Sequence, residues 1–314
     1  MGVQFVDVAK EAGLNVETIF GGEHRNKYLL ETTGCGAAFF DYDQDDWLDI
    51  FLVNGWRLEG FPKGQEPVCH LFKNNRDGTF TDVTLKSGLA RSGWGQACCV
   101  GDYNNDGWLD ILVANGHVYP EVDGTQVDAA YAEHKYLYRN LRNGQFEDLS
   151  RIGGSGITTA AKARGFAVGD FDNDGDLDAV VNCVNAPPQL LRCDSTLNRS
   201  WVKIRVVGTK SNRTGIGARL KVVAQTGTPV LTAKPGTPLT QIEEVHSCNG
   251  YFSASDLRIH FGLGDAKKVD LVEIRWPSGQ VDTLQDLDVN RLYVVEEGGK
   301  ILKTDAFTAS TKKA

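Results

Sequence analysis

The stretch Asp41-Tyr-Asp-Gln-Asp-Asp-Trp-Leu-Asp49 is an acidic loop that recurs twice further along the chain. The other copies are Asp102-Tyr-Asn-Asn-Asp-Gly-Trp-Leu-Asp110 and Asp170-Phe-Asp-Asn-Asp-Gly-Asp-Leu-Asp178. Each copy has oxygen-bearing side chains at positions 1, 3, 5 and 9, and a turn residue at position 6. A hard cation such as Ca2+ binds roughly six to eight oxygen atoms, and this spacing wraps side-chain oxygens around one point. The pattern therefore predicts a calcium-binding hairpin in each copy.

The predicted ligands are the residues at these four positions of each loop, which allows up to three Ca2+ ions. They are Asp41, Asp43, Asp45 and Asp49; Asp102, Asn104, Asp106 and Asp110; and Asp170, Asp172, Asp174 and Asp178. The alternative is a set of solvated acidic hairpins without metal. We favour the metal because clustered carboxylates repel one another unless a cation lies between them. The expected role of Ca2+ is mainly structural.

Position 6 of such a loop often needs a positive φ, which glycine adopts without steric cost. Gly107 and Gly175 occupy this position in the second and third copies, whereas the first copy has Asp46. We therefore expect the first site to be the weakest or the most distorted. Mg2+ is a less suitable ion, because it prefers an octahedron that retains several waters.

Composition excludes several classes of partner. The 314-residue chain carries a formal net charge of −8, which argues against nucleic acid or an anionic membrane as the main partner. No apolar run reaches the length of about 18 residues that a membrane span needs, so we expect no membrane insertion. The chain shows no signal peptide, and is expected to be intracellular or to begin after a removed leader. Seven cysteines leave at least one thiol without an intrachain partner.

Strand-like segments surround each acidic loop in the same order, which indicates a repeat of four short antiparallel strands. The first residues of the copies, Asp41, Asp102 and Asp170, lie 61 and 68 residues apart. A regular spacing of this size indicates a repeat architecture, and four strands per unit fit a blade of a β-propeller. We assign residues 1–195 to this repeat domain and predict an all-β fold with a partial or small propeller.

Only three strands of the third repeat precede residue 195. The segment Val3–Val8 resembles the fourth strand of the other repeats and is predicted to complete the third unit, closing the ring. Three blades are fewer than the roughly four to eight of known propellers. A blade hidden in the insertions 9–35, 54–67 and 116–135, an open arc, and closure on another domain or subunit all remain open. An oligomer that completes the array is thus one expectation.

The sequence pattern changes near residue 196. Alternating segments such as Trp201–Val207, Val269–Trp276 and Arg291–Glu296 predict a second domain over residues 196–300, an antiparallel β-sandwich or barrel. Residues 303–314 are mostly polar, and we predict a flexible tail over residues 301–314.

Both halves of the chain resemble known families. The acidic loops with their flanking strands resemble FG-GAP/VCBS repeats, the calcium-loop blades also found in integrin α-chains. The second domain resembles the ASPIC/UnbV domain through the segments Leu197–Thr214, Gly215–Arg219, Gly250–Asp256, His260–Gly264 and Arg275–Gly279. Together they resemble the cartilage-acidic-protein-like family over nearly the whole chain. The resemblance implies Ca2+ binding at the twelve loop residues, binding of a ligand or partner, and a secreted or extracytoplasmic location.

Two functional hypotheses follow. The first is a calcium-binding β-repeat protein with an adhesion-like role, which binds a protein, small-molecule or carbohydrate ligand and has no catalytic residues. The alternative is an enzyme or accessory protein of secondary-metabolite biosynthesis, because UnbV-type proteins also occur in natural-product gene clusters. Its pocket would be formed by the long insertions, and the candidate ligand-binding residues there are His24, Tyr28, Glu31, His117, Tyr119, Glu121 and His134. The simpler interpretation is that these are ordinary loop residues. A third possibility is that the C-terminal domain binds the partner.

Overall fold

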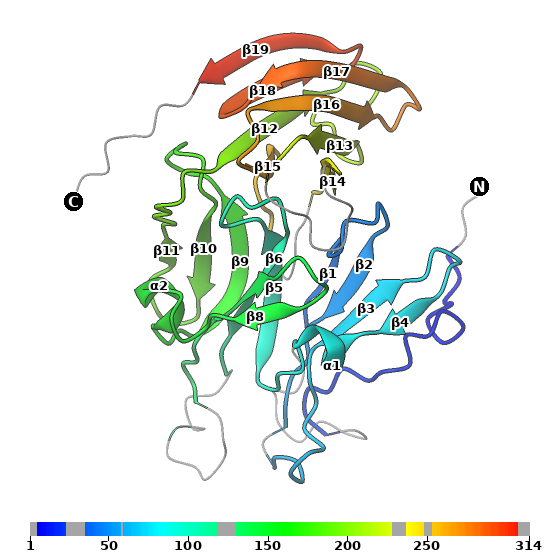
Figure 1. The fold of residues 1–314 in the computed structure, drawn as a ribbon. Coiled ribbons are helices and arrows are strands. Elements are labelled where there is room, and N and C mark those ends of the chain that lie inside the picture. The colour runs from blue at the N-terminus through cyan, green and yellow to red at the C-terminus, as the bar shows by residue number, and fades with distance from the viewer. Residues whose placement is uncertain are drawn as a thin grey trace.

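The computed structural model describes residues 5–22, 35–57, 59–117, 123, 130–227, 237–247 and 253–306. The predicted all-β fold is confirmed: the strands of these residues form five sheets, and the helices α1 (Thr84–Ser87) and α2 (Ser155–Thr158) are single turns. Three sheets come from the repeats and two from the C-terminal domain (Figure 1). Among the described residues, no helix has the length and apolar character needed to cross a membrane.

The first two repeats form four-stranded antiparallel sheets in which neighbours in sequence are neighbours in space. The first sheet comprises β1 (Ala37–Phe40), β2 (Asp49–Leu52), β3 (His70–Asn74) and β4 (Phe80–Asp82). The second comprises β5 (Gly95–Gly101), β6 (Asp110–Asn115), β7 (Tyr136–Asn140) and β8 (Phe146–Asp148). Each acidic loop connects the first two strands of its sheet, as expected for a propeller blade.

The third repeat contributes the three strands that its own sequence predicts, and they form a three-stranded sheet. Its strands are β9 (Ala163–Gly169), β10 (Asp178–Cys183) and β11 (Gln189–Leu191), in the order β11-β10-β9. The three repeat sheets lie side by side, with β5 between β1 and β9. Period-two alternation places Cys98 in the core shared with the first sheet and Cys99 in the core shared with the third. The three blades therefore pack face to face as an arc.

The predicted pairing of Val3–Val8 with this chain's own third sheet is wrong. The described part of that segment, residues 5–8, is not in a strand, and it leads into a turn that packs on the first sheet. The backbone N–H of Phe80 in β4 donates to the carbonyl oxygen of Ala12 at 2.7 Å. Figure 1 shows the N-terminal segment running beside β4, on the far side of the arc from β11. The turn that follows the segment thus fixes it at the opposite end of the array.

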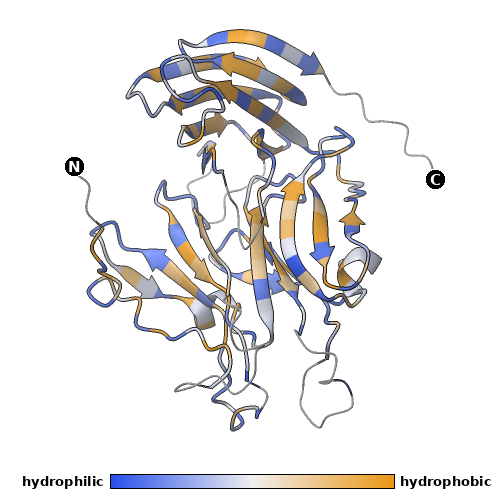
Figure 2. Cartoon of the chain, turned by 180° about the vertical axis from the view of Figure 1, so that it is seen from behind, coloured by the Kyte–Doolittle hydropathy of each residue, from blue (hydrophilic) through white to orange (hydrophobic). Residues whose placement is uncertain are grey.

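The C-terminal domain consists of two four-stranded sheets, so of the predicted sandwich or barrel it is a sandwich. One sheet, in the order β15-β12-β18-β19, contains β12 (Ser200–Val207), β15 (Ile259–Gly264), β18 (Arg291–Glu296) and β19 (Lys300–Ala306). The other, in the order β14-β13-β16-β17, contains β13 (Arg219–Ala224), β14 (Leu239–Glu244), β16 (Lys268–Arg275) and β17 (Val281–Asp288). Their inward side chains, among them Val202, Leu220 and Ile274, form one buried core. Figure 2 shows the corresponding alternation of hydrophobic and hydrophilic residues along these strands.

Two details of this domain differ from the sequence prediction. Strands β12 and β18 pair in parallel, although an all-antiparallel domain was expected. Strand β19 pairs with β18 from Ala306 to Lys300, so residues 301–306 belong to the sheet and the predicted flexible tail over 301–314 is wrong for them. Backbone hydrogen bonds to β18 order these residues although their side chains are mostly exposed.

The C-terminal domain covers the end of the repeat sheets that carries the acidic loops (Figure 1). The longer connections of the first two repeats, from β2 to β3 and from β6 to β7, leave the opposite end of the sheets. The described insertion candidates His117 and His134 therefore lie at the end of the repeat domain opposite the acidic loops.

Candidate metal centres

The aspartate at position 1 of each acidic loop organises the loop backbone. Its two carboxylate oxygens accept the backbone N–H groups of positions 5 and 6. The distances are 3.0 and 2.9 Å for Asp41, 3.0 and 2.6 Å for Asp102, and 3.1 and 2.8 Å for Asp170. This double contact curls the chain around the carboxylate, and buried polar groups require such partners.

Position 6 has a positive φ in all three loops, as predicted: +70° at Asp46, +89° at Gly107 and +96° at Gly175. Asp46 therefore adopts the backbone conformation for which the other copies use glycine. Position 4 also has a positive φ, between +57° and +58°, at Gln44, Asn105 and Asn173. Whether the first site is the weakest stays a prediction.

The aspartate at position 9 joins its loop to the third strand of the same sheet. Asp49 accepts the backbone N–H groups of Tyr42 at 3.1 Å and Asn74 at 2.8 Å. The equivalent contacts of Asp178 are with Phe171 at 3.1 Å and Cys193 at 2.8 Å, and Asp110 accepts the N–H of Asn140 at 2.8 Å. Position 9 thus has a structural role that does not require a cation.

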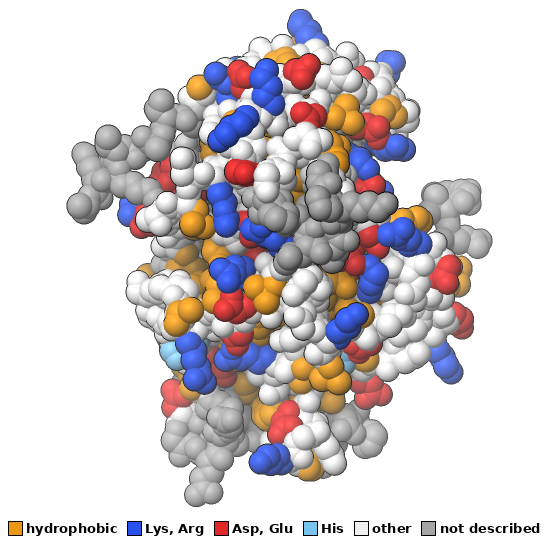
Figure 3. Space-filling view, viewed as in Figure 1, with side chains coloured by type: hydrophobic (Ala, Val, Ile, Leu, Met, Phe, Trp, Pro, Cys, Tyr) orange, Lys and Arg blue, Asp and Glu red, His pale blue; other side chains and the backbone are white. Residues whose placement is uncertain are grey.

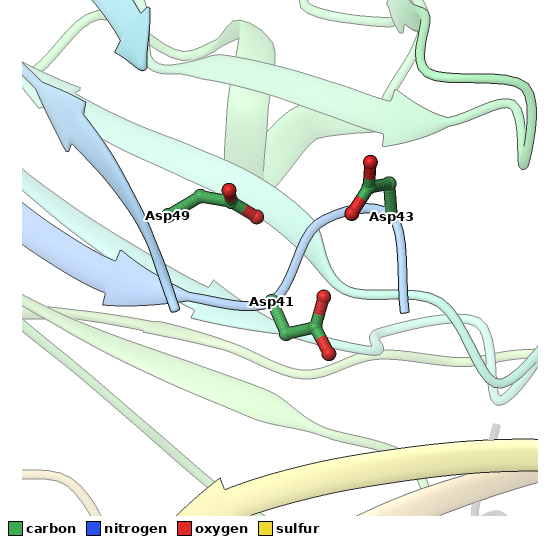
Figure 4. Close-up of side chains that lie close together, drawn as sticks. All are labelled: Asp41, Asp43 and Asp49. Atoms are coloured by element: carbon green, nitrogen blue, oxygen red, sulfur yellow. The ribbon is translucent and has the colours of Figure 1, made fainter. Parts of the chain in front are cut away.

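Two of the three loops bring three carboxylates together. One oxygen from each of Asp41, Asp43 and Asp49 lies within 4.8 Å of the others in the first loop, and Asp170, Asp172 and Asp174 meet the same limit in the third. Figure 4 shows the Asp43 and Asp49 carboxylates facing each other across the first loop, with Asp41 beside them. In each triad the position-3 residue has a buried oxygen without a hydrogen-bond partner, Oδ1 of Asp43 and Oδ1 of Asp172. An oxygen buried in this way is costly unless a donor or a cation satisfies it.

The charge of the first loop is only partly compensated by the ion pairs of the described residues. Lys73 contacts both Asp43 and Asp45, and Arg76 contacts Asp45 at 2.9 Å. Two cationic side chains therefore face the four carboxylates at positions 1, 3, 5 and 9. Burial raises the pKa of Asp41 and of Asp49 to about 7, which reflects the cost of keeping both carboxyls ionised. A divalent cation would remove this cost.

A lysine from the C-terminal domain contacts the third loop. Lys203 on β12 is buried and forms an ion pair with Oδ2 of Asp170. Burial also raises the pKa of Asp178 to about 6. Asp172 and Asp174 lie beside this pair in the third triad, so carboxylate oxygens that a cation could bind gather at the boundary between the two domains.

Arginines occupy the second loop. Arg142 Nη2 contacts Asp106 Oδ2 at 2.7 Å, and Arg199 Nη1 contacts the carbonyl oxygen of Asn104 at 2.8 Å and also its side-chain oxygen. Asn104 at position 3 further donates to Asp110 at 3.2 Å. Burial, followed by the charge of Asp106, raises the pKa of Asp102 to about 8. Among the described residues, these acidic groups do not form a carboxylate triad like those of the other loops.

The residues at positions 1 and 3 therefore fit a calcium site in the first and third loops, joined by Asp49 in the first and Asp174 in the third. The predicted ligands Asp45 and Asp178 lie outside the triads: Asp45 pairs with Lys73 and Arg76, and Asp178 accepts backbone N–H groups. The second loop has the predicted backbone but a different charge balance. Its arginines were missed because Arg142 and Arg199 lie far from the loop in sequence.

Side chains at position 4 link each loop to the next, a role that the sequence pattern did not reveal. Gln44 donates to the carbonyl oxygen of Gly107, and Asn105 donates to that of Gly175 at 3.0 Å. Asn173 continues the series by accepting Nη1 of Arg258 from the C-terminal domain at 2.9 Å. The sequence feature that could have revealed these contacts is the amide side chain at position 4, which all three copies share.

The C-terminal domain contacts all three loops. Lys221 pairs with the Asp46 side chain, and His260 Nε2 lies 2.7 Å from Oδ1 of Asn105. The backbone N–H of Gly264 donates to the carbonyl oxygen of Asn105 at 2.9 Å. On the face shown in Figure 3, Lys and Arg side chains lie among Asp and Glu side chains along this boundary. The candidate metal centres thus lie at the interface between the domains.

The candidate ligand-binding residues in the insertions do not form a site in the part that the structure describes. His117 is fully buried, and its ring packs edge-on against Trp94 with centroids 4.3 Å apart. His134 is exposed. The residues His24, Tyr28, Glu31, Tyr119 and Glu121 lie outside the described residues. The simpler interpretation, that these are ordinary loop residues, fits the exposed His134, whereas His117 is a buried residue packed against Trp94.

A cavity of about 1120 Å³ lies between the second and third repeat sheets. Leu137, Leu149 and Leu191 line its apolar side, and Tyr103, Arg142 and Arg199 line the side toward the second acidic loop. The long insertions of the first two repeats do not contribute to this lining. The pocket predicted from those insertions is therefore not the cavity seen among the described residues.

Comparisons with known proteins agree with the division into two parts. Residues 41–113 and 127–181 match the FG-GAP-like repeat family, and residues 208–302 match the ASPIC and UnbV family. The chain is 25% identical over 280 residues to Cartilage acidic protein 1 of Xenopus tropicalis, which covers 74% of this chain and 41% of that protein. It is 25% identical over 323 residues to the protein of that name from Homo sapiens, covering 88% and 43%. The chain spans less than half the length of the curated relatives it matches.

Proposed function

The chain belongs to the proteins that combine FG-GAP-like repeats with an ASPIC and UnbV domain, and on that premise we propose that it is a calcium-stabilised, adhesion-like protein. Two Ca2+ ions are proposed, one in the first acidic loop and one in the third. They stabilise the loops on which the C-terminal domain rests, and the assembled molecule binds a partner. The similarity to Cartilage acidic protein 1 supports an extracytoplasmic location, where Ca2+ is abundant.

The observation that carries this proposal is the pair of carboxylate triads with a buried, unpartnered oxygen at position 3. Asp41, Asp43 and Asp49 would hold the first ion, and Asp170, Asp172 and Asp174 the second. Carboxylate oxygens are the ligands that Ca2+ prefers. The ion would supply positive charge where burial otherwise makes ionised carboxylates costly.

The second loop is proposed to bind no ion, because Arg142 and Arg199 already provide its positive charge. Both guanidinium groups approach Asp106, at 2.7 and 3.7 Å. Asn104 at position 3 has no carboxylate to offer a cation and instead bonds Asp110 and Arg199. The arginines would thus replace the ion as permanent counter-charges in the middle repeat.

Thermal unfolding tests the calcium proposal. A ligand that binds only the folded protein stabilises it by about 2.7 kcal/mol per site at a concentration one hundred times its Kd. The melting temperature should therefore fall by several degrees when Ca2+ is replaced by excess chelator, and Mg2+ should restore little of it. An unchanged melting temperature in chelator would contradict the proposal.

The partner-binding surface is proposed to be the end of the repeat sheets remote from the C-terminal domain. The connections from β2 to β3 and from β6 to β7 leave this end, and long connections on a repeat scaffold commonly carry binding residues. An array of extracellular-matrix proteins and glycans, probed with protein in Ca2+ and in chelator, checks this. Binding should require Ca2+ and should be lost when residues 59–67 are replaced by a short Gly-Ser linker. Retention after that replacement would move the partner site elsewhere.

A further inference from the structure

The third repeat sheet ends in a strand whose outer edge lacks a partner among the described residues. Strand β11 pairs with β10 on one side, whereas β3 and β7, its equivalents in the other sheets, each pair with a fourth strand as well. The side chain of Leu190 in β11 is 58% exposed. The cavity of about 1120 Å³ opens beside this strand, where a fourth strand would pack against the second sheet. In the described part of the chain, the third sheet therefore has no fourth strand.

The N-terminal segment has the sequence of a fourth strand. Gln4-Phe-Val-Asp-Val8 matches Thr79-Phe-Thr-Asp-Val83 and Gln145-Phe-Glu-Asp-Leu149, which contain β4 and β8. Phe146 is 6% exposed within its sheet, whereas Phe5 is 98% exposed and Val6 74% exposed. The chain thus has an exposed segment with the sequence of a fourth strand, and among its described residues a third sheet that lacks one.

The backbone after the N-terminal segment has the geometry found after β4 and β8. Asp7 Oδ1 accepts the N–H of Ala9 at 3.0 Å, as Asp82 and Asp148 accept the equivalent N–H groups at 2.9 Å. Within the following turns, three i to i−4 bonds of 2.8 Å occur at equivalent positions: Ala12 to Val8, Ser87 to Val83, and Gly153 to Leu149. Five residues after Val8, Val83 and Leu149, φ is +86°, +79° and +86° at Gly13, Gly88 and Gly154. The segment is therefore preorganised as a fourth strand with its turn.

Contacts of this turn show to which sheet the strand belongs. A Cβ placed on Gly88, in the turn of the first sheet, would lie 3.1 Å from the carbonyl oxygen of Phe146 in the second sheet. A Cβ on Gly13 would lie 2.8 Å from the carbonyl oxygen of Phe80 in the first sheet. The N-terminal turn thus contacts the first sheet as the turn of the first sheet contacts the second. Its strand belongs to a sheet that precedes the first, on the side away from the second.

We propose that this preceding sheet is the third sheet of a second copy of the chain. Each copy donates residues 5–8 as the fourth strand of its partner's β11-β10-β9 sheet, and the two arcs of three sheets close into a ring of six. The exchange is reciprocal, as two-fold symmetry requires. Six blades fall within the range of roughly four to eight that closed propellers have. The third sheet of the same copy cannot accept the strand, because the second sheet lies between that sheet and the first sheet, on which the N-terminal turn packs.

The other two sheets give the register of the proposed pairing. Phe80 lies opposite Asn74, and Phe146 lies opposite Asn140. Both asparagines bind the position-9 aspartate of their repeat through the backbone, and Cys193 does so in the third repeat. Phe5 of one copy therefore lies opposite Cys193 of the other. One contact has no counterpart, since Ala9 replaces the hydroxyl residues Thr84 and Ser150 that accept a strand N–H in the other sheets.

The cavity provides the space for the phenylalanine. The ring centroid of Phe146 lies 6.3 Å from that of Tyr42 at position 2 of the preceding acidic loop. The equivalent tyrosine for the third sheet is Tyr103, which lines the cavity together with Leu191 and Cys193. Phe5 of the second copy would thus fill this cavity against Tyr103, as Phe146 packs on Tyr42.

Molar mass in solution tests the association. Light scattering after size-exclusion chromatography should give about twice the chain mass of 34.3 kDa. Phe5→Asp should give the mass of one chain, because a buried charge replaces the proposed anchor. Leu85→Asp, a matched change of an exposed apolar residue on α1, should leave the mass doubled. A single-chain mass for the unmodified protein over the accessible concentration range would overturn the proposal.

Crosslinking tests the register. Phe5→Cys places a thiol opposite the native Cys193, and oxidation should link two chains. Val6→Cys, which points to the other face of the strand, and Phe5→Cys combined with Cys193→Ser should not form this link. Chains of natural and heavy isotope composition are mixed before oxidation, and the linked peptides are mapped by mass. Peptides that pair a natural with a heavy chain mark links between two chains. A link between position 5 of one chain and Cys193 of another supports the proposal. A link only within one chain, or no link, would overturn it.

Discussion

Aspartates of one acidic loop have different roles, which substitution can separate. Both oxygens of Asp49 accept backbone N–H groups, whereas Asp43 has a buried oxygen with no hydrogen-bond partner. Asp49→Asn should therefore destabilise the protein by about 1–3 kcal/mol already in chelator, because a buried N–H loses its acceptor, and by more in Ca2+, because Asp49 is also a proposed ligand. Asp43→Asn should lower stability mainly in Ca2+. Denaturant titrations of both variants in the two conditions measure the difference.

Comparing Asp43→Asn with Asp49→Asn tests whether the carboxylate at position 3 binds an ion. Both substitutions convert one aspartate of the same loop to asparagine, so that size and backbone preference change equally. Equal losses for Asp43→Asn in Ca2+ and in chelator would show that its carboxylate serves the fold rather than an ion.

A carboxylate of the C-terminal domain predicts an acid-sensitive step. Burial would raise the pKa of Glu297, but hydrogen bonds from Ser278 and from the backbone N–H groups of Ser211, Thr209 and Lys210 hold it well below its usual value. Because the folded-state pKa is depressed, the stabilisation is present above the unfolded value of about 4.3 and is lost as the pH falls below it.

Melting temperatures of the wild type and of Glu297→Gln as a function of pH check this. Glu297→Gln should melt at a lower temperature near neutral pH, and the two curves should converge in acid. A constant gap down to the lowest pH at which the protein folds would contradict a role of the ionised carboxyl. Glu273→Gln serves as the control, since Glu273 forms an ion pair with Arg275 at 2.7 Å, a residue two positions away on the same strand.

At the scale of elements, the position-4 amides join each acidic loop to its neighbour. Asn105 forms more of these contacts than Gln44 or Asn173. It donates to Gly175 and Asp176 in the third loop at 3.0 and 3.2 Å and contacts His260 at 2.7 Å. Asn105→Gly removes the side chain while keeping the φ of +57° free of strain. It should destabilise the protein by about 2–3 kcal/mol, since buried partners are left unsatisfied.

Asn185→Gly is the control for this element-scale prediction. Asn185 also has a positive φ, of +49°, but its side chain is exposed. Chemical denaturation should show little change for Asn185→Gly. A similarly small change for Asn105→Gly would mean that the contacts between the blades do not depend on this amide.

The sequence predicted elements well where one face of a strand is buried. The repeat strands were expected around each acidic loop, where they are found, and β12 was expected at Trp201–Val207, close to its observed bounds. Strands β17 and β19 were missed. Both are edge strands of their sheets, with mostly exposed side chains, and pairing to a neighbour rather than an apolar pattern determines their position.

At the scale of the whole molecule, contacts distant in sequence limited what could be predicted. The loop spacing revealed carboxylate clusters, but not that Arg142 and Arg199 enter the second loop from other elements. The Val3–Val8 pattern predicted a fourth strand, but a strand pattern does not specify its sheet, and the described part of the segment, residues 5–8, is in no strand. The position of the C-terminal domain over the acidic loops depends on dispersed residues such as Lys203 and Lys221, which have no local signature.

The count of bound Ca2+ per chain tests the central claim most directly. Equilibrium dialysis followed by elemental analysis should give two ions for the wild type, one for Asp43→Asn, one for Asp172→Asn and none for the double variant. Asn104→Ser, the matched change in the second loop, should still retain two. A wild type without bound Ca2+, or a folded double variant that keeps both ions, would contradict the assignment of the metal centres.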